Sequence, residues 1–264
     1  MLSTLLQRAL NNWRRRHATQ SADAEGVTDN LGKNNKAFYD TQSALLMLLG
    51  STTPSAKHFD YERVAWVMAA ASSAEYMLQH MTDAQNLIHR GPLLGLALEK
   101  SKVNGLIMEF GVYRGKSLRA IAHRSAQEVH GFDSFEGLPQ DWSFFQKKGR
   151  FSLHGQAPHF DEPNIRVHQG YFERTLPLFL AQHPEPARFI HIDCDLYTST
   201  RTVLELLRPR IVSGTVILFD EYLNYPGWQK HEYKAFQEFV AQAGIAYCYL
   251  GYASAYYAVA VQVV

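Results

Sequence analysis

Four carboxylates follow two apolar runs in the second half of the chain: Asp193, Asp195, Asp220 and Glu221. If the runs are neighbouring strands, these side chains meet at one edge of a sheet, where unpaired carboxylates repel one another and titrate at raised pKa. A hard divalent cation such as Mg²⁺ relieves this repulsion and prefers oxygen ligands. The sequence therefore predicts a metal site formed by Asp193, Asp220 and Glu221.

Other interpretations of these side chains stay open on the residues alone. The carboxylates would equally serve as helix caps or as ion-pair partners of Arg201, Arg208 or Lys230. Three histidines compete for a chemical role, although a lone histidine is usually structural. They are His154 and His159, in a segment containing glycine and proline, and His191, on the strand that bears Asp193.

An apolar run, a glycine turn and the start of a helix follow one another at residues 108–117. The segment reads Met-Glu-Phe-Gly-Val-Tyr-Arg-Gly-Lys-Ser. Gly111 and Gly115 allow close approach of the backbone to a ligand, and the new helix presents free amides. The spacing is neither the dinucleotide fingerprint nor the Walker pattern, which disfavours NAD and ATP. Taken alone, such a turn is structural at least as often as it is functional.

Asp133 strengthens the ligand interpretation of the glycine turn. It ends the next apolar run, roughly 20 residues beyond Gly111, where a carboxylate suits the hydroxyls of a ribose. The alternative is an aspartate that caps the following turn. Its distance from the glycine turn favours ribose binding.

Alternating strands and helices must position these side chains. Apolar runs typical of buried strands span 106–110, 128–133, 165–169, 188–193 and 215–220, and helix candidates span 116–126, 172–182, 198–207 and 228–243. This order predicts an α/β fold with a doubly wound, mostly parallel sheet that binds ligands at the carboxyl ends of its strands. The runs 246–252 and 255–263 predict a closing β-hairpin, which brings the sheet to seven strands.

Helical periodicity prevails before residue 104, so we expect an N-terminal helical extension over 1–103 and a core over 104–264. Helices are expected at 37–49, 61–80 and about 82–100, the last with a kink at Gly91 and Pro92. A short amphipathic helix that ends in the basic residues 14–16 is more consistent with packing on the protein than with binding a membrane surface.

Composition excludes several classes of function. The 264 residues contain 26 Lys and Arg against 25 Asp and Glu, a net charge of +1, which removes the electrostatic argument for nucleic-acid binding. No apolar stretch reaches the roughly 20 residues of a transmembrane helix, and the start does not resemble a signal peptide. We therefore expect a cytoplasmic protein without a membrane partner. Cys194 and Cys248 fit strand positions in a reduced core.

Five motifs in this order resemble the macrocin O-methyltransferase family of class I methyltransferases, over roughly residues 90–245. They are Glu-Phe-Gly-Val-Tyr-Arg-Gly at 109–115, Asp-Ser-Phe-Glu-Gly-Leu-Pro at 133–139, Gly-Tyr-Phe-Glu-Arg-Thr-Leu-Pro at 170–177, Ile-Asp-Cys-Asp-Leu-Tyr-Thr-Ser-Thr at 192–200 and Asp-Glu-Tyr at 220–222. The resemblance implies a class I, Rossmann-like methyltransferase fold. It also implies S-adenosylmethionine as the cofactor.

The resemblance also implies roles for individual residues. Cofactor-binding positions would be Glu109, Gly111, Tyr113, Gly115, Ser117, Asp133, Ser134, Gly170, Tyr171 and Asp193. Of these, Glu109 and Gly111 would adjoin the methionine part, Asp133 the ribose and Ser134 the adenosine.

At the other motifs, Asp193, Asp220 and Glu221 would hold Mg²⁺, and Asp195 would be the general base. A helix cap is an equally weighted role for Asp195. The family commonly has two aspartates where this chain has Asp220 and Glu221, which puts the third metal ligand in question.

The implied reaction is methyl transfer to a hydroxyl of a sugar or of a glycosylated natural product. A catechol-type phenol is a second choice of acceptor, and an inactive scaffold that binds S-adenosylmethionine is the alternative of a different class. Trp142, Phe144, Phe145 and Phe151 would line an acceptor or adenine pocket, although aromatic side chains in such a loop more often anchor it to the body of the protein. We expect a homodimer, with residues 1–103 supplying a lid and dimer contacts.

Overall fold

The computed structural model describes residues 61–142 and 146–264. The chain divides into two compact units, Met1–Val64 and Ala65–Val264, and the sheet and its cavity belong to the second. The helix expected at 37–49, the basic segment 14–16 and the aromatic residues Phe144 and Phe145 lie outside the described residues. The domain boundary expected between 103 and 104 stays a prediction.

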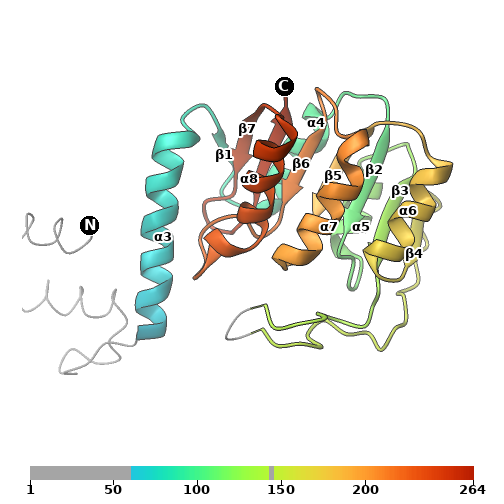
Figure 1. Cartoon of the computed structure of the whole chain (residues 1–264), viewed down its shortest axis with the longest axis horizontal. Helices are drawn as coiled ribbons and strands as arrows, with labels where there is room; N and C mark the ends of the chain where they lie inside the picture. Colours follow the sequence, from blue (N-terminus) through green and yellow to red (C-terminus); the bar gives the residue numbers. More distant parts are fainter. Residues whose placement is uncertain (1–60, 143–145) are drawn as a thin grey trace, which may run out of the picture. The chain divides into compact units, whose positions relative to one another are not determined.

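An eight-stranded sheet forms the centre of the second unit (Figure 1). Its strands are β1 (Gln85–Asn86), β2 (Leu106–Phe110), β3 (Val129–Asp133), β4 (Ile165–Gln169), β5 (Ala187–Ile192), β6 (Val216–Phe219), β7 (Tyr247–Tyr252) and β8 (Val259–Val263). Their spatial order is β1-β7-β8-β6-β5-β2-β3-β4. Strands β2 to β6 are parallel, and β8 is antiparallel to both β6 and β7. The α/β fold, the parallel sheet and the closing hairpin are confirmed.

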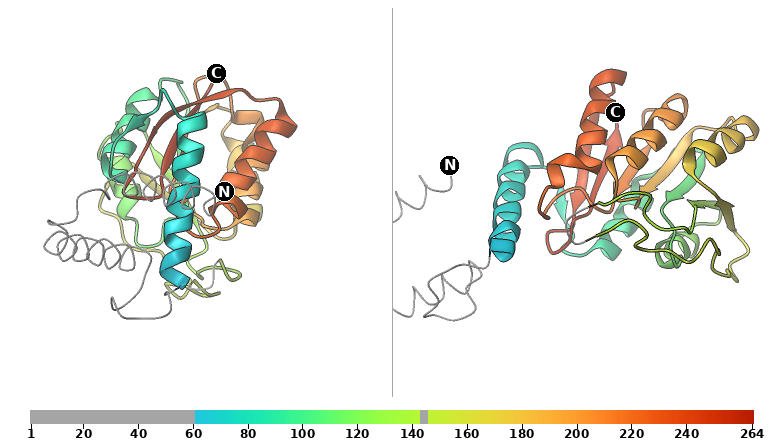
Figure 2. Two further views of the ribbon diagram at one scale, coloured as in Figure 1. Left: turned by 90° about the vertical axis from the view of Figure 1, so that its left-hand side faces the viewer. Right: turned by 60° about the horizontal axis from the view of Figure 1, so that its bottom comes forward.

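Helices cover both faces of this sheet (Figures 1 and 2). They are α4 (Arg90–Lys100), α5 (Lys116–Ala122), α6 (Phe172–Gln182), α7 (Tyr197–Leu207) and α8 (Glu232–Ala243), with 3₁₀ turns η1 (Arg208–Arg210) and η2 (Trp228–Lys230). Helix α3 (Tyr61–His80) lies beyond the β1–β7 end of the sheet (Figure 1), where Tyr76 is hydrogen-bonded to Tyr249 of β7. One buried cluster joins α6, α7 and α8 to the sheet through residues such as Phe110 and Phe132. A second joins α4 and α5 to the other face through residues such as Ile107. Successive side chains of β2 point to opposite faces of the sheet, so this strand contributes residues to both clusters.

The segment before α4 corrects the helix expected over 82–100. The helix begins only at Arg90, because Gln85 and Asn86 instead pair with β7 as the eighth strand, β1. The side chain of Asn86 accepts the amide of Ile88, whose φ of 61° is outside the helical region. Pro92 then lies in the first turn of α4, where its missing amide costs no hydrogen bond, so no kink is needed.

Two other predicted helices differ at their ends. The helix expected over 116–126 stops at Ala122, and the one expected over 228–243 is divided at His231 into η2 and α8. Neither change moves the strand ends that carry the predicted site. Among the residues that the structure describes, no helix has the length and apolarity needed to cross a membrane.

Candidate active site

A cavity of about 680 Å³ lies at the carboxyl ends of β2, β3, β5 and β6. It brings together eleven of the predicted site residues: Gly111, Tyr113, Ser117, Asp133, Ser134, Gly170, Tyr171, Asp193, Asp195, Asp220 and Glu221. Glu109 and Gly115 are outside its lining. Residues from five separate motifs therefore share one cavity, as expected for a parallel sheet that binds ligands at its strand ends.

The turn after β2 is shaped by a close approach of two backbones. Gly111 has a φ of 93°, and a Cβ added there would lie 1.7 Å from the carbonyl oxygen of Asp193. Gly115, with a φ of 73°, directly precedes α5, and a Cβ there would meet the ring of Phe160 at 2.4 Å. Gly111 is thus required for the contact between the turn after β2 and the backbone of Asp193. Gly115 is required because the ring of Phe160 packs against it.

Asp133 ties the loops on two strands together. Its Oδ2 accepts the amides of Val112 and Tyr113, both at 2.8 Å, and its Oδ1 accepts the amide of Phe135 at 2.8 Å. Asp133 therefore caps the turn that follows it, which was the alternative to a ribose-binding role. Asp133 also lines the cavity. A role toward ribose would use the lone pairs that these amides leave free.

Its neighbours on this wall are held by hydrogen bonds of their own. The hydroxyl of Ser134 accepts the amide of Glu136 at 3.2 Å, and the hydroxyl of Tyr171 donates to Glu136 at 2.5 Å. Gly170 has a φ of 141°, and its amide donates to the carbonyl of Asp133. These contacts connect the loop after β4 with the loop after β3.

Behind the cavity wall, a buried row of charges runs from Glu109 through His191 to Asp220. Nδ1 of His191 lies 2.9 Å from Oε2 of Glu109, and Nε2 lies 3.9 Å from Oδ1 of Asp220. The Ser117 hydroxyl donates to the other oxygen of Glu109 at 3.2 Å. Burial alone would lower the pKa of His191, but its two carboxylate neighbours raise it well above the usual range.

Asp220 is the most heavily paired carboxylate of the cluster. Arg90 on α4 donates to its Oδ2 at 3.0 Å, and the hydroxyl of Tyr256 lies 3.4 Å from the same oxygen. Burial opposes ionisation of Asp220, but His191 and Arg90 outweigh it and hold the pKa of this carboxyl below its usual value. Asp220 is therefore the ionised member of the cluster.

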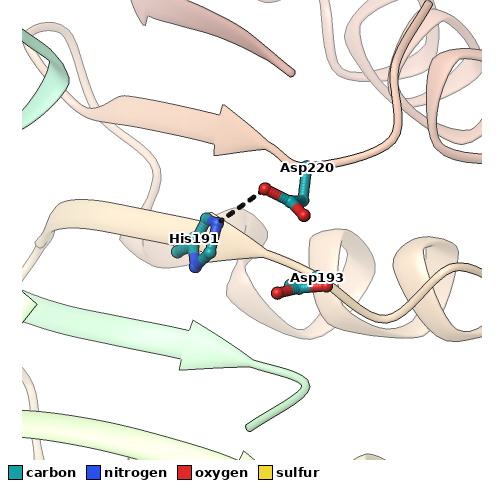
Figure 3. Close-up of side chains that lie close together, drawn as sticks. All are labelled: His191, Asp193 and Asp220. Carbon is teal, nitrogen blue, oxygen red and sulfur yellow. Dashed lines mark ion pairs between the residues drawn. The ribbon is translucent and has the colours of Figure 1, made fainter. Parts of the chain in front are cut away.

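Asp193 and Asp195 follow β5 and face the same cavity (Figure 3 shows Asp193 beside His191 and Asp220). Burial, followed by repulsion from Asp220, raises the pKa of Asp193 well above its usual value. The same two causes raise the pKa of Asp195 to about 7. Asp195 also has a φ of 62°, in the left-handed region. A side chain held there with a pKa near neutrality is suited to proton transfer.

Glu221 is buried at 7% exposure and lines the cavity. Its amide donates to Oε2 of Glu232, in the first turn of α8, at 3.0 Å. Within the described residues, Oε2 of Glu221 has no hydrogen-bond partner. Burial, followed by repulsion from Asp220, raises the pKa of Glu221 well above its usual range. The carboxyl group thus lies at the cluster, and one of its oxygens has no partner in residues 61–142 and 146–264.

Aromatic side chains form the remaining wall of the cavity: Trp66, Trp142, Phe151, Tyr225, Tyr256 and Tyr257. The Trp142 ring lies 5.7 Å from that of Tyr225, and its indole nitrogen is buried with no hydrogen-bond partner among the described residues. Trp142 and Phe151 thus line the cavity as expected. Among the histidines considered as competitors, His154 and His159 are outside the lining, and His191 lies behind it.

Sequence reasoning missed Arg90 and Tyr256, and it left His191 unassigned. Arg90 is 130 residues from Asp220 in the sequence, so no local pattern links the two. A signal did exist for His191, because residues two apart on a strand point to the same face and Asp193 follows it by two. Its pairing with Glu109 across β2 and β5 depends on the strand register.

The strand order and the cavity at the strand ends define the fold of the class I, Rossmann-like methyltransferases. Residues 108–222 match the family model described as "Methyltransferase domain". This segment contains the last three residues of β2, all of β3, β4, β5 and β6, and the carboxylates of the cluster. Less than half of the chain is thus similar to a methyltransferase domain, and the narrower resemblance to the macrocin O-methyltransferases stays a prediction.

Similar proteins include enzymes of natural-product biosynthesis. An 8-demethyl-8-(2,3-dimethoxy-alpha-L-rhamnosyl)-tetracenomycin-C 4'-O-methyltransferase of Streptomyces olivaceus is 32% identical over 46% of this chain and 54% of its own length. This chain thus spans about half the length of that relative. The crystal structure of CalS11, a calicheamicin methyltransferase, superposes with a TM-score of 0.54 at 22% identity, covering 78% of this chain and 94% of CalS11. This likeness supports the fold.

Proposed function

We propose that this chain is an S-adenosylmethionine-dependent O-methyltransferase that uses a divalent cation and acts on a hydroxyl of a sugar or glycosylated natural product. The observation that carries the proposal is the single cavity that joins the glycine turn after β2 to the carboxylates after β5 and β6. The match of residues 108–222 to a methyltransferase domain supports it. The similarity to a rhamnosyl-tetracenomycin O-methyltransferase supports the choice of acceptor.

The cavity fits the cofactor at its glycine-turn end. Gly111 lets the turn after β2 lie directly against the backbone of Asp193, and Asp133 accepts the amides of Val112 and Tyr113 in this turn. Ser134 and Tyr171 extend this wall. S-adenosylmethionine supplies an electrophilic methyl group on a sulfonium when it is bound. The loops after β2, β3 and β4 would bind and orient it.

The other end of the cavity, which is lined by carboxylates, offers the oxygen ligands that a divalent cation requires. Asp193 and Asp220 present oxygens at adjacent strand ends, and Glu221 has a buried oxygen without a partner among the described residues. A bound cation lowers the pKa of an oxygen that it contacts. Asp193 and Asp220 are the residues that would hold it. Glu221 was the third ligand expected from the sequence.

Asp195 is the residue that we assign as general base. Its pKa is raised to about 7, so near neutral pH a large share of the molecules carries the unprotonated carboxylate. The side chain lines the cavity and is 7% exposed, which keeps it from being surrounded by water. Asp195 would accept the proton of the acceptor hydroxyl as the oxygen attacks the methyl carbon.

The aromatic wall suits a ring-shaped acceptor. Trp142 and Tyr225 offer flat faces, and the indole N–H of Trp142, which has no partner among the described residues, offers a donor to an oxygen of a ligand. Tyr256 and Tyr257, whose rings lie 4.7 Å apart, line the cavity as well. Aromatic faces with carboxylates at one end are consistent with a sugar hydroxyl presented toward Asp195.

A methyl-transfer assay tests this function. Full-length protein would be incubated with S-adenosylmethionine that carries a deuterated methyl group, Mn²⁺ or Mg²⁺, and rhamnosides and catechols as acceptors. We expect a mass increase of one labelled methyl group on a glycoside, abolished by EDTA and by Asp195→Asn. If only the catechols were labelled, the acceptor would be a phenol and not a sugar hydroxyl. Binding of S-adenosylhomocysteine without labelling of any acceptor would favour the inactive scaffold.

A further inference from the structure

We propose that the cation is held by His191, Asp193 and Asp220, with Glu109 orienting the imidazole, and that Glu221 is not a ligand. This inference rests on the cation use that is part of the proposed function. One ligand atom from each of the three residues lies within 4.8 Å of the others (Figure 3). It is the one such group of histidine, cysteine and acidic side chains in residues 61–142 and 146–264.

The distances suit shared coordination. Nε2 of His191 lies 3.9 Å from Oδ1 of Asp220, and two ligands that are each about 2.1 Å from one ion lie up to about 4.2 Å apart. The imidazole and this carboxylate oxygen are thus already at a chelating separation. Arg90 binds the other oxygen, Oδ2, at 3.0 Å, which leaves Oδ1 for the cation.

The other side of the imidazole is held as it is in many metal sites. Ligating histidines usually donate their second ring N–H to a carboxylate or carbonyl, which fixes the tautomer and the direction of the ring. Here Nδ1 of His191 lies 2.9 Å from Oε2 of Glu109, and Ser117 holds the other oxygen of Glu109. On binding, the Nδ1 proton stays toward Glu109, and the cation takes the place of the proton on Nε2, which leaves to solvent.

Glu221 provides an independent sign that the cluster receives a ligand. It is 93% buried, since its exposure is 7%, and it lines the cavity beside Asp220. Its Oε2 has no hydrogen-bond partner in the described part of the chain. An unpaired buried oxygen is unfavourable unless a ligand supplies a partner. Glu221 is absent from the group of converging ligand atoms, so we assign it a hydrogen bond to a group bound at the cation rather than to the cation itself.

One imidazole and two carboxylates also change the expected metal. Mg²⁺ favours oxygen ligands, whereas imidazole suits divalent transition metals. The site therefore fits Mn²⁺, Fe²⁺, Co²⁺ or Zn²⁺ better than Mg²⁺. Tighter binding of these ions is common to most nitrogen and oxygen sites. Direct detection of the nitrogen ligand is therefore a stronger test than a comparison of metal affinities.

Pulsed electron paramagnetic resonance of Mn²⁺ bound to the full chain gives that sign. The wild-type protein with one equivalent of Mn²⁺ is expected to show a ¹⁴N coupling from the ligating imidazole. The measurement requires no variant and no methyl acceptor. Bound Mn²⁺ without a ¹⁴N coupling would overturn the proposal and return the third position to Glu221.

Two variants identify the source of the coupling. His191→Phe keeps a ring of similar shape without nitrogen, and we expect it to lose the coupling and to weaken Mn²⁺ binding by at least about tenfold. Glu221→Gln is the matched control, which should keep the coupling and bind Mn²⁺ within about threefold of wild type. The opposite pattern, with the coupling kept in His191→Phe and binding lost in Glu221→Gln, would contradict the assignment.

Failure of this inference is distinguishable from failure of the proposed function. Titration with S-adenosylhomocysteine in EDTA reports the glycine-turn end of the cavity without any cation. Binding of S-adenosylhomocysteine together with no Mn²⁺ binding would overturn the metal site alone. Loss of both would count against the proposed function itself.

Discussion

The two ends of the cavity are built by different means. The glycine-turn end depends on backbone: Gly111 touches the carbonyl of Asp193, and Asp133 binds three amides of nearby loops. The carboxylate end depends on side chains from distant segments, such as Arg90 on α4 and Asp220 after β6. Backbone contacts and hydrogen bonds form the first end, whereas interactions between charged side chains form the second. Substitutions should therefore disturb the two ends in different ways.

The largest effect is expected from Gly111→Ala. The added Cβ collides with the backbone of Asp193, and the positive φ adds roughly 1–2 kcal/mol of strain. We expect no measurable binding of S-adenosylhomocysteine by calorimetry and a lower melting temperature. Gly155→Ala is the control, because Gly155 also has a positive φ of 69° but has open space at the Cβ position. Equal behaviour of both variants would show that the close approach at Gly111 does not matter.

Asp220→Asn should separate the two ends. The substitution removes a charge that Arg90 and His191 both face, so we expect turnover to fall at least about 100-fold. Binding of S-adenosylhomocysteine in EDTA should stay within about threefold of wild type, because Asp220 belongs to the carboxylate end. Asp133→Asn is the opposite case and should weaken this binding by at least about tenfold. Equal loss of cofactor affinity in both variants would argue against two distinct ends.

The pH dependence of kcat/KM tests Asp195. A general base acts only when it is deprotonated, and the pKa of Asp195 is raised to about 7. Activity should therefore rise with pH through about 7 and be lost below it. Asp195→Asn should lower kcat by roughly 10²–10⁴-fold and remove this acidic limb. An unchanged limb in the variant would assign the titration to another group. The helix cap that was the alternative role of Asp195 is not seen, because Leu196 is the N-cap residue of α7 and no side-chain cap bond is formed there.

The smallest effect is expected from Tyr256→Phe. Its hydroxyl lies 3.1 Å from Nη1 of Arg90 and 3.4 Å from Oδ2 of Asp220. Loss of one such hydrogen bond costs about 1 kcal/mol, or roughly fivefold in kcat/KM. The ring remains to pack on Arg90, whose guanidinium lies 5.0 Å from the ring centroid. A loss as large as that of Asp220→Asn would mean that the hydroxyl itself takes part in the reaction.

The sequence predicted the strand ends better than the contacts between them. Buried apolar runs located β2 to β6, and helix α6 begins and ends where its periodicity indicated. The helix expected over 82–100 included the segment 82–89, which is not helical. No local sequence signal shows that Gln85 and Asn86 pair with β7. This pairing depends on tertiary structure, which overrides local propensity.

The candidate site shows the same division. Position in five motifs was enough to predict ten residues that line the cavity, and Ser117, two residues beyond the first motif, is the eleventh. The partners of Asp220 depend on strand register and on a helix 130 residues away, so they required the structure. The roles of those lining residues, the homodimer and the lid over residues 1–103 stay predictions.

Calorimetric titration with S-adenosylhomocysteine in EDTA shows whether the glycine-turn end of the cavity is a cofactor site. We expect binding in the micromolar range for wild-type protein, little change in Asp220→Asn and no binding in Gly111→Ala. Absence of binding to wild-type protein that remains folded would contradict the account and leave the cavity without its proposed cofactor.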